Sequence, residues 1–211
     1  MKMKVIAILL MLTLMAFLPF AVAKCGTKTK IQNTMSTADN AKYESEVDDN
    51  SQLDEDKILC GLVAALYKSD YSDETVKAIT ILLNNNYSLE PNKFDLSDNS
   101  VFLYTENADN STQEIYSKIE NIISSSKELL IYSDNKNVYI PYSIISNGNT
   151  VYNENYSYIS PVASPWDCFS KEYDKNSECV GVSIEGLDYL CKNGMNAEEA
   201  LNWYLPNCEI K

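Results

Sequence analysis

The stretch from Asp54 to Leu83, DEDKILCGLVAALYKSDYSDETVKAITILL, carries two consecutive helical patterns that determine the fold. In the first, an acidic turn is followed by apolar residues at helical spacing: Ile58, Leu59, Leu62, Val63 and Leu66. The second pattern begins after Ser72, and the face it is expected to bury consists of Val76, Ile79, Leu82 and Leu83. The sequence therefore predicts two adjacent helices at the centre of the domain.

The elements that follow these helices are of both kinds. Residues 100–105 alternate as a strand does, and residues 111–114 (STQE) form a capping box for a helix. The apolar stripe of that helix is Ile115, Ile119, Ile122 and Ile123. Two further strands, at 129–132 and 138–145, are predicted on either side of a turn at Asp134-Asn135.

Two more helices are predicted near the C-terminus. Ser183 caps the first, which ends at Gly194, and Asn196 with Glu199 caps the second, which ends before Pro206. Helices and strands are mixed without regular βαβ alternation. We therefore predict an α+β fold, a single mixed domain of helices with a small antiparallel sheet.

The N-terminus has the pattern of an export signal. Two lysines precede an apolar run from Val5 to Leu18, and Ala21-Val22-Ala23 supplies the small residues that a signal peptidase reads. An uncleaved anchor is the alternative, although the run is short for a span, and a lipoprotein site at Cys25 is disfavoured by Lys24. Residues 24–53 are polar and predict a flexible linker. The folded domain is expected at 54–211, in an exported, cell-wall-associated protein.

Charge and composition exclude several classes of function. The chain has 17 Lys, no Arg, no His and 30 acidic residues. After removal of residues 1–23 the formal charge is 15 − 30 = −15, which argues against nucleic acid and against an anionic membrane as partner. Without His there is no Ser-His-Asp triad, no Cys-His dyad and no imidazole metal ligand. We expect no cofactor and no metal.

Six cysteines in an exported chain permit up to three disulfides, and sequence alone allows 15 connectivities. Cys191 with Cys208 is the pair we expect first, because Cys208 follows the short helix that packs back after Gly194. Cys168 with Cys179, which bound a polar loop, is the next pair. No CxxC pair supports a zinc site, and Cys60 in its apolar helix is alternatively a single buried thiol.

Six short motifs follow one another along residues 54–211. They are LCGLVAA at 59–65, ETVKA at 74–78, IISNGNT at 144–150, SPWD at 164–167, GVS at 181–183 with Gly186, Lys192 and Gly194, and YLP at 204–206. In order and spacing they resemble the stage II sporulation protein D family. The resemblance implies that family's α+β fold and a cell-wall protein related to amidase enhancers and peptidoglycan lytic transglycosylases.

The same resemblance places Leu66 where the family has its catalytic glutamate. Lytic cleavage needs a carboxyl group that protonates the glycosidic oxygen and then acts as base, and leucine does neither. Ile79 and Asn84 replace two further polar family positions. The expectation is therefore a non-catalytic, peptidoglycan-associated module. Asp70 and Asp188 are the candidates for a displaced acid, each alternatively a solvated charge.

Glycan binding is expected to use aromatic faces and hydroxyl groups. The candidates are Tyr142, Ser143 and Ser183, within a tyrosine-rich region that also contains Tyr152, Tyr156, Tyr158, Trp166 and Tyr173. Packing within the domain is the alternative role of these aromatics, and for Trp166 the favoured one. The expected partners are peptidoglycan glycan strands or a cell-wall amidase. An active transglycosylase with a displaced acid and an exported interaction protein without glycan affinity remain as alternatives.

Overall fold

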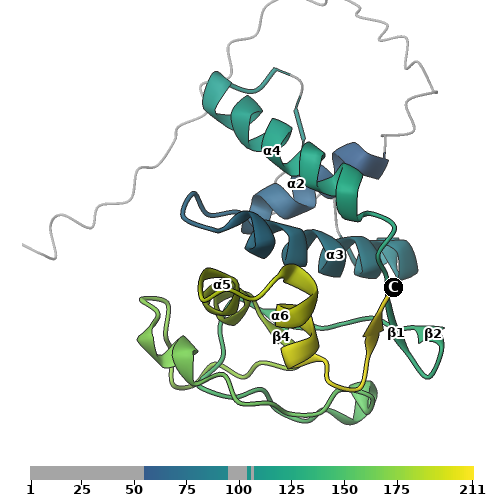
Figure 1. Cartoon of the computed structure of the whole chain (residues 1–211), viewed down its shortest axis with the longest axis vertical. Coiled ribbons are helices and arrows are strands. Elements are labelled where there is room, and N and C mark those ends of the chain that lie inside the picture. The colour runs from purple at the N-terminus through teal and green to yellow at the C-terminus, as the bar shows by residue number, and fades with distance from the viewer. Residues whose placement is uncertain (1–54, 95–103, 106) are drawn as a thin grey trace, which may run out of the picture. The chain divides into compact units, whose positions relative to one another are not determined.

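The computed structural model describes residues 55–94, 104–105 and 107–211, which form five α-helices and two small sheets (Figure 1). The helices are α2 (Glu55–Leu66), α3 (Asp73–Leu89), α4 (Asn110–Ser126), α5 (Ile184–Lys192) and α6 (Ala197–Tyr204). The predicted signal peptide, the linker and most of the strand predicted at 100–105 lie outside the described residues. None of the helices within the described ranges is long and apolar enough to cross a membrane.

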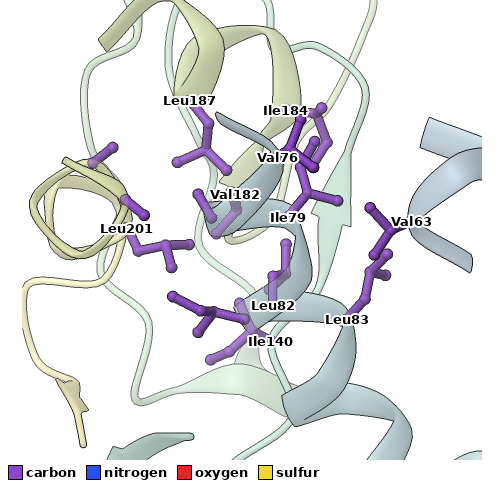
Figure 2. Close-up of a cluster of buried hydrophobic side chains, with 14 of the residues drawn as sticks. Val63, Val76, Ile79, Leu82, Leu83, Ile140, Val182, Ile184, Leu187 and Leu201 are labelled. Carbon is purple, nitrogen blue, oxygen red and sulfur yellow. The ribbon is translucent and has the colours of Figure 1, made fainter. Parts of the chain in front are cut away.

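Helix α3 lies at the centre of the domain, with α2 and α4 packed on one side and α5 and α6 on the other (Figure 1). Every residue from Ala78 to Leu83 is buried, as expected for a helix covered on several faces. Figure 2 shows Ile79, Leu82 and Leu83 of α3 among side chains from α2, α5 and α6. Burial of each such side chain contributes roughly 1.5–3 kcal/mol, so this helix anchors the fold as its pattern predicted.

Most of the described helices begin at the capping residues that the sequence predicts. The Ser72 hydroxyl accepts from the Thr75 amide at 3.1 Å, and the Ser183 hydroxyl accepts from the Gly186 amide at 3.1 Å. Asn196 and Glu199 form the expected capping box of α6.

The cap of α4 differs from the prediction. Asp109 is the N-cap, in place of a box opened by Ser111, and its carboxylate accepts from the Thr112 amide at 3.0 Å. The Ser111 hydroxyl donates to the same carboxylate at 2.5 Å, so the acid takes the capping position and the serine only supports it.

The three-stranded sheet is antiparallel and has the order β2-β1-β5. It consists of β1 (Ile131–Ser133), β2 (Lys136–Asn137) and β5 (Glu209–Ile210). Asp134 and Asn135 join β1 to β2 with φ of 50° and 60°, the left-handed values that a tight hairpin turn requires. The α+β fold with a small antiparallel sheet is confirmed. A second sheet pairs β3 (Tyr142–Ser143) in parallel with β4 (Val182–Ser183).

The strand predicted at 138–145 forms only at its end, as β3. Asn85 and Asn86 of α3, which are fully buried, bind the backbone that this strand would use. The Asn86 side chain donates to the Ile140 carbonyl at 2.7 Å and accepts from the Ile140 amide at 2.8 Å. Asn85 does the same for the Val138 carbonyl, at 2.9 Å, and the Ile131 amide, at 2.8 Å. Two side chains thus take the place of a strand partner.

The predicted disulfides, Cys191 with Cys208 and Cys168 with Cys179, are not formed. Free thiols occupy all the described cysteine positions, which are Cys60, Cys168, Cys179, Cys191 and Cys208. The thiols face different groups: Cys179 hydrogen-bonds with Ser143 and Cys191 with Thr75. Proximity of two segments along the chain does not orient their side chains, and a disulfide needs both Cβ vectors aimed at each other.

Candidate functional site

A cleft of about 400 Å³ opens between α5 and the segments that follow α2 and β3. The short helix η3 (Pro165–Phe169) and the loop after it form one wall. The residues that line the cleft are Lys68, Asp70, Tyr71, Trp166, Asp167, Phe169, Ser170, Lys171, Glu172, Glu185, Asp188, Tyr189, Lys192 and Asn193. The cleft therefore combines ion pairs with aromatic side chains.

Glu185, in the first turn of α5, lies at the centre of one ion-pair group. Its Oε1 accepts from the Lys68 ammonium at 2.7 Å and the Tyr71 hydroxyl at 2.9 Å, and its Oε2 accepts from the Ser170 hydroxyl at 3.1 Å. Burial raises the pKa of the Glu185 carboxyl, but hydrogen bonds from Lys68 and Tyr71 and the Lys68 charge outweigh it, so this pKa is below its ordinary value. Glu185 is an anion at neutral pH.

Lys192, at the end of α5, organises a second ion-pair group. Its Nζ lies 2.6 Å from Asp188 Oδ2 and 3.2 Å from Asp70 Oδ2. The other oxygen of Asp188 accepts from the Thr75 hydroxyl at 2.9 Å. Burial lowers the pKa of Lys192, but hydrogen bonds to Asp188 and Asp70 outweigh it, and the pKa is raised. Both carboxylates are thus held by donors.

Aromatic side chains from η3 and α5 line the cleft. The Trp166 ring is stacked on Tyr189 with centroids 5.3 Å apart and planes 4° from parallel. The ring of Trp203, which does not line the cleft, has its centroid 5.4 Å from that of Trp166. Phe169 is 87% exposed, and Tyr189 and Trp203 are also exposed. Exposed aromatic area of this kind at a cleft indicates a binding surface.

A buried polar group lies behind the aromatic wall. The Tyr204 hydroxyl lies 2.6 Å from the Ser164 hydroxyl and accepts from Trp166 Nε1 at 3.2 Å. Gly186 lets this group approach α5, because a Cβ there would lie 1.8 Å from the Tyr204 oxygen. Tyr204 therefore fixes both the position of α5 and the orientation of Trp166.

The position where the resemblance places the acid lies outside the cleft, and its two proposed substitutes are ion-pair partners of Lys192. Leu66 is half-buried, packs against the core and does not line the cleft. Helix α2 ends at Leu66, so Asp70 does not continue its face; it lies in the following turn with a 73% exposed side chain. The hydrogen bond from Lys192, and then its charge, lower the pKa of Asp70. Asp188 lines the cleft but is 7% exposed.

The predicted glycan-binding residues come together in the parallel sheet, where Ser143 pairs with Ser183 and Tyr142 with Val182. Ser183 is fully buried and its hydroxyl caps α5, which leaves it inaccessible to a ligand. Burial raises the pKa of the Tyr142 hydroxyl. None of the three lines the cleft. Trp166, expected to be a core anchor, is half-buried and contacts both the interior and the cleft.

Sequence reasoning missed Glu185, Tyr71, Ser170 and Tyr189 as cleft residues. A signal for part of this set exists in the sequence: Glu185, Asp188, Tyr189 and Lys192 share one face of α5, at the spacing i, i+3, i+4, i+7. Lys68 and Tyr71 carry no local signal, because they reach Glu185 from more than a hundred residues away.

Among the residues described, no three His, Cys, Asp or Glu side chains come together to hold a metal ion. No protein-family model matches this chain, and no match was found among curated proteins. The resemblance to stage II sporulation protein D rests on the sequence motifs alone.

Proposed function

We propose that this protein is an exported, non-catalytic, peptidoglycan-associated module that binds glycan strands in the cleft beside α5. The observation that carries the proposal is the aromatic wall formed by Trp166, Tyr189 and Phe169, which lies next to the ion-pair groups of Glu185 and Lys192 in the same cleft. Sugar rings offer apolar faces and polar edges, and sites that hold such ligands combine aromatic surfaces with a few oriented polar groups.

The ionisation of the cleft supports binding without cleavage. A general acid must hold a proton near the working pH, whereas the pKa values of Glu185 and Asp70 are both lowered. Leu66, at the family's acid position, has no proton to give. Neither these two carboxyl groups of the cleft nor Leu66 outside it therefore supplies the proton that a glycosidic oxygen would need.

Cosedimentation of the purified protein with purified peptidoglycan tests the binding. We expect the wild-type protein in the pellet, and Tyr189→Ala and Phe169→Ala to weaken retention by about 5- to 30-fold each, the usual cost of truncating an aromatic contact. Tyr152→Ala is the matched control, since Tyr152 is 61% exposed but does not line the cleft. Failure of the wild-type protein to bind would favour an interaction protein, such as an amidase partner, without glycan affinity.

Digestion of peptidoglycan followed by muropeptide analysis tests the absence of cleavage. We expect no anhydro-muropeptides from the wild-type protein. Anhydro products that disappear with Asp70→Asn or Asp188→Asn would identify an active transglycosylase with a displaced acid and would overturn the non-catalytic assignment.

A further inference from the structure

The ion pairs of the cleft leave an excess of negative charge. Lys68 lies 2.7 Å from Glu185 and 3.6 Å from Glu172, so one cation is shared by two carboxylates. Lys192 is shared in the same way by Asp188 and Asp70. Each group of three has a formal charge of −1, and three lysines face five carboxylates in the cleft lining as a whole. This excess of negative charge favours a positively charged ligand.

The two groups flank one aromatic ring. Lys68 and Lys192 approach the Tyr71 ring at 5.9 and 6.0 Å from its centroid. Burial, then the hydrogen bond to Glu185 and the charges of Glu185, Asp188 and Asp70, raise the pKa of the Tyr71 hydroxyl. Glu185, Asp188 and Asp70 thus all act on the hydroxyl of this ring, beside the two lysines.

Asp167 adds an unmet need for a hydrogen-bond donor. It lines the cleft and is 2% exposed, and its Oδ2 accepts from the Ser146 amide at 3.0 Å and the Ser146 hydroxyl at 2.5 Å. Its Oδ1 has no partner within the described residues. A buried carboxylate oxygen without a donor is costly. The oxygen itself is buried, so it adds to the negative potential behind the cleft lining and favours a cation in the cleft without contacting it.

We propose that the cleft selects amino sugars whose amino group is free, so that the preferred ligand is a glycan containing glucosamine in place of N-acetylglucosamine. This inference rests on the proposed glycan binding. The aromatic wall takes the faces of the sugar rings, while the carboxylates and the nearby aromatic faces take the ammonium. An N-acetyl group is neutral and bulkier, and it offers a single N–H donor.

Binding of glucosamine oligomers and N-acetylglucosamine oligomers of equal length, measured by titration calorimetry, tests the selection. We expect the wild-type protein to prefer the free-amine oligomer by about tenfold at low salt, with the preference falling as ionic strength rises. The variant Asp70→Asn with Glu172→Gln, which alters the two rim carboxylates, should reduce the preference severalfold. The control variant, Asp134→Asn with Glu154→Gln, removes the same charge from exposed residues that do not line the cleft and should leave the preference unchanged.

Each result separates this inference from the proposed function. Equal or better binding of the acetylated oligomer overturns the selection but leaves glycan binding intact. An equal loss of the free-amine preference in both double variants shows general attraction of a cation to an acidic protein, and this result also overturns the selection. Failure to bind either oligomer or peptidoglycan overturns the proposed function. A third arm uses peptidoglycan before and after enzymatic removal of its stem peptides. Binding that disappears with the peptides places the ammonium on peptide and overturns the assignment to sugar.

Discussion

Glu185 accepts three hydrogen bonds from donors on two other segments, so its carboxylate joins α5 to the turn before α3 and to the loop after η3. We expect Glu185→Gln to lower the free energy of unfolding by roughly 1–3 kcal/mol at neutral pH, the usual range for charge-assisted hydrogen bonds. Lys68 would lose its closest carboxylate partner. Urea unfolding of the two proteins measures the difference.

The pH dependence of that difference has a defined direction. The pKa of Glu185 in the folded protein is lower than its ordinary value of 4.5, so its contribution is complete above about pH 5 and is lost as pH falls through the folded-state pKa. Wild-type and Glu185→Gln proteins should therefore converge in stability below pH 4.5. A difference that stays constant down to pH 3 would show that the charge of Glu185 contributes nothing.

Gly186 is the position where α5 tolerates no side chain. The Cβ of Gly186→Ala would lie 1.8 Å from the Tyr204 oxygen and 2.8 Å from Ser164 Oγ, so we expect a loss of about 1–3 kcal/mol from overpacking. Tyr204→Phe removes the oxygen that causes the closest clash. In a double-mutant cycle by thermal unfolding, Gly186→Ala should cost less in the Tyr204→Phe background than in the wild type. Additive effects would mean that α5 yields elsewhere.

At the scale of elements, three consecutive asparagines at the end of α3 differ sharply in role. Asn86 is fully buried and satisfies both backbone groups of Ile140, whereas Asn84 donates one hydrogen bond to the Lys127 carbonyl. We expect Asn86→Ala to destabilise by roughly 2–4 kcal/mol, because it leaves two buried backbone groups without partners. Asn84→Ala is the matched control and should cost less than about 1 kcal/mol.

Hydrogen exchange locates the damage from Asn86→Ala. We expect faster exchange of the Ile140 amide and of its neighbours up to β3, while the central turns of α3 remain protected. Uniform loss of protection throughout the domain would show that the asparagine stabilises the whole fold and does not specifically anchor this segment.

At the scale of the whole molecule, the sequence predicts those features whose causes are local. Ser72, Ser183 and Asn196 each cap the helix next to them, and the apolar face of α3 needs only its own periodicity to be recognised. The strand predicted at 138–145 rests on an equally local signal, the turn at Asp134-Asn135, and is mostly wrong. Two asparagines about fifty residues upstream bind the carbonyls of Val138 and Ile140, and no local pattern reveals this.

The cleft is harder to predict for the same reason. Trp166 was singled out from the sequence, but its stacking on Tyr189 and its link to Tyr204 depend on how η3, α5 and α6 pack. Glu185 meets Lys68 and Tyr71 only because α5 packs against α3 and the turn that precedes it. Residue types in the cleft could be read from the sequence, whereas their combination could not.

The thiols test the packing of the whole molecule, because four of the described cysteines are buried in different parts of the fold and burial lowers their reactivity. Burial, as the largest cause in each case, raises the pKa of Cys60 to about 12 and those of Cys179, Cys191 and Cys208 to about 11, from an ordinary value of 9.0. The reactive form is the thiolate, so a rise from 9.0 to about 11 cuts its population roughly a hundredfold. Cys168 is exposed.

We therefore expect iodoacetamide at pH 8 to label Cys168 of the native protein rapidly and these four thiols at least about a hundredfold more slowly, until urea unfolds the chain. Peptide mapping by mass spectrometry reads each site separately, with Cys25, which lies outside the described residues, scored by itself. The same map without reductant is the control for oxidation.

A peptide linking Cys191 to Cys208, or Cys168 to Cys179, would contradict the free thiols of the structure and restore the pairing that the sequence predicts. Rapid labelling of Cys60 would instead show that the layer between α2 and α4 opens readily, since its sulfur lies 3.9 Å from the Tyr116 carbonyl in that interface.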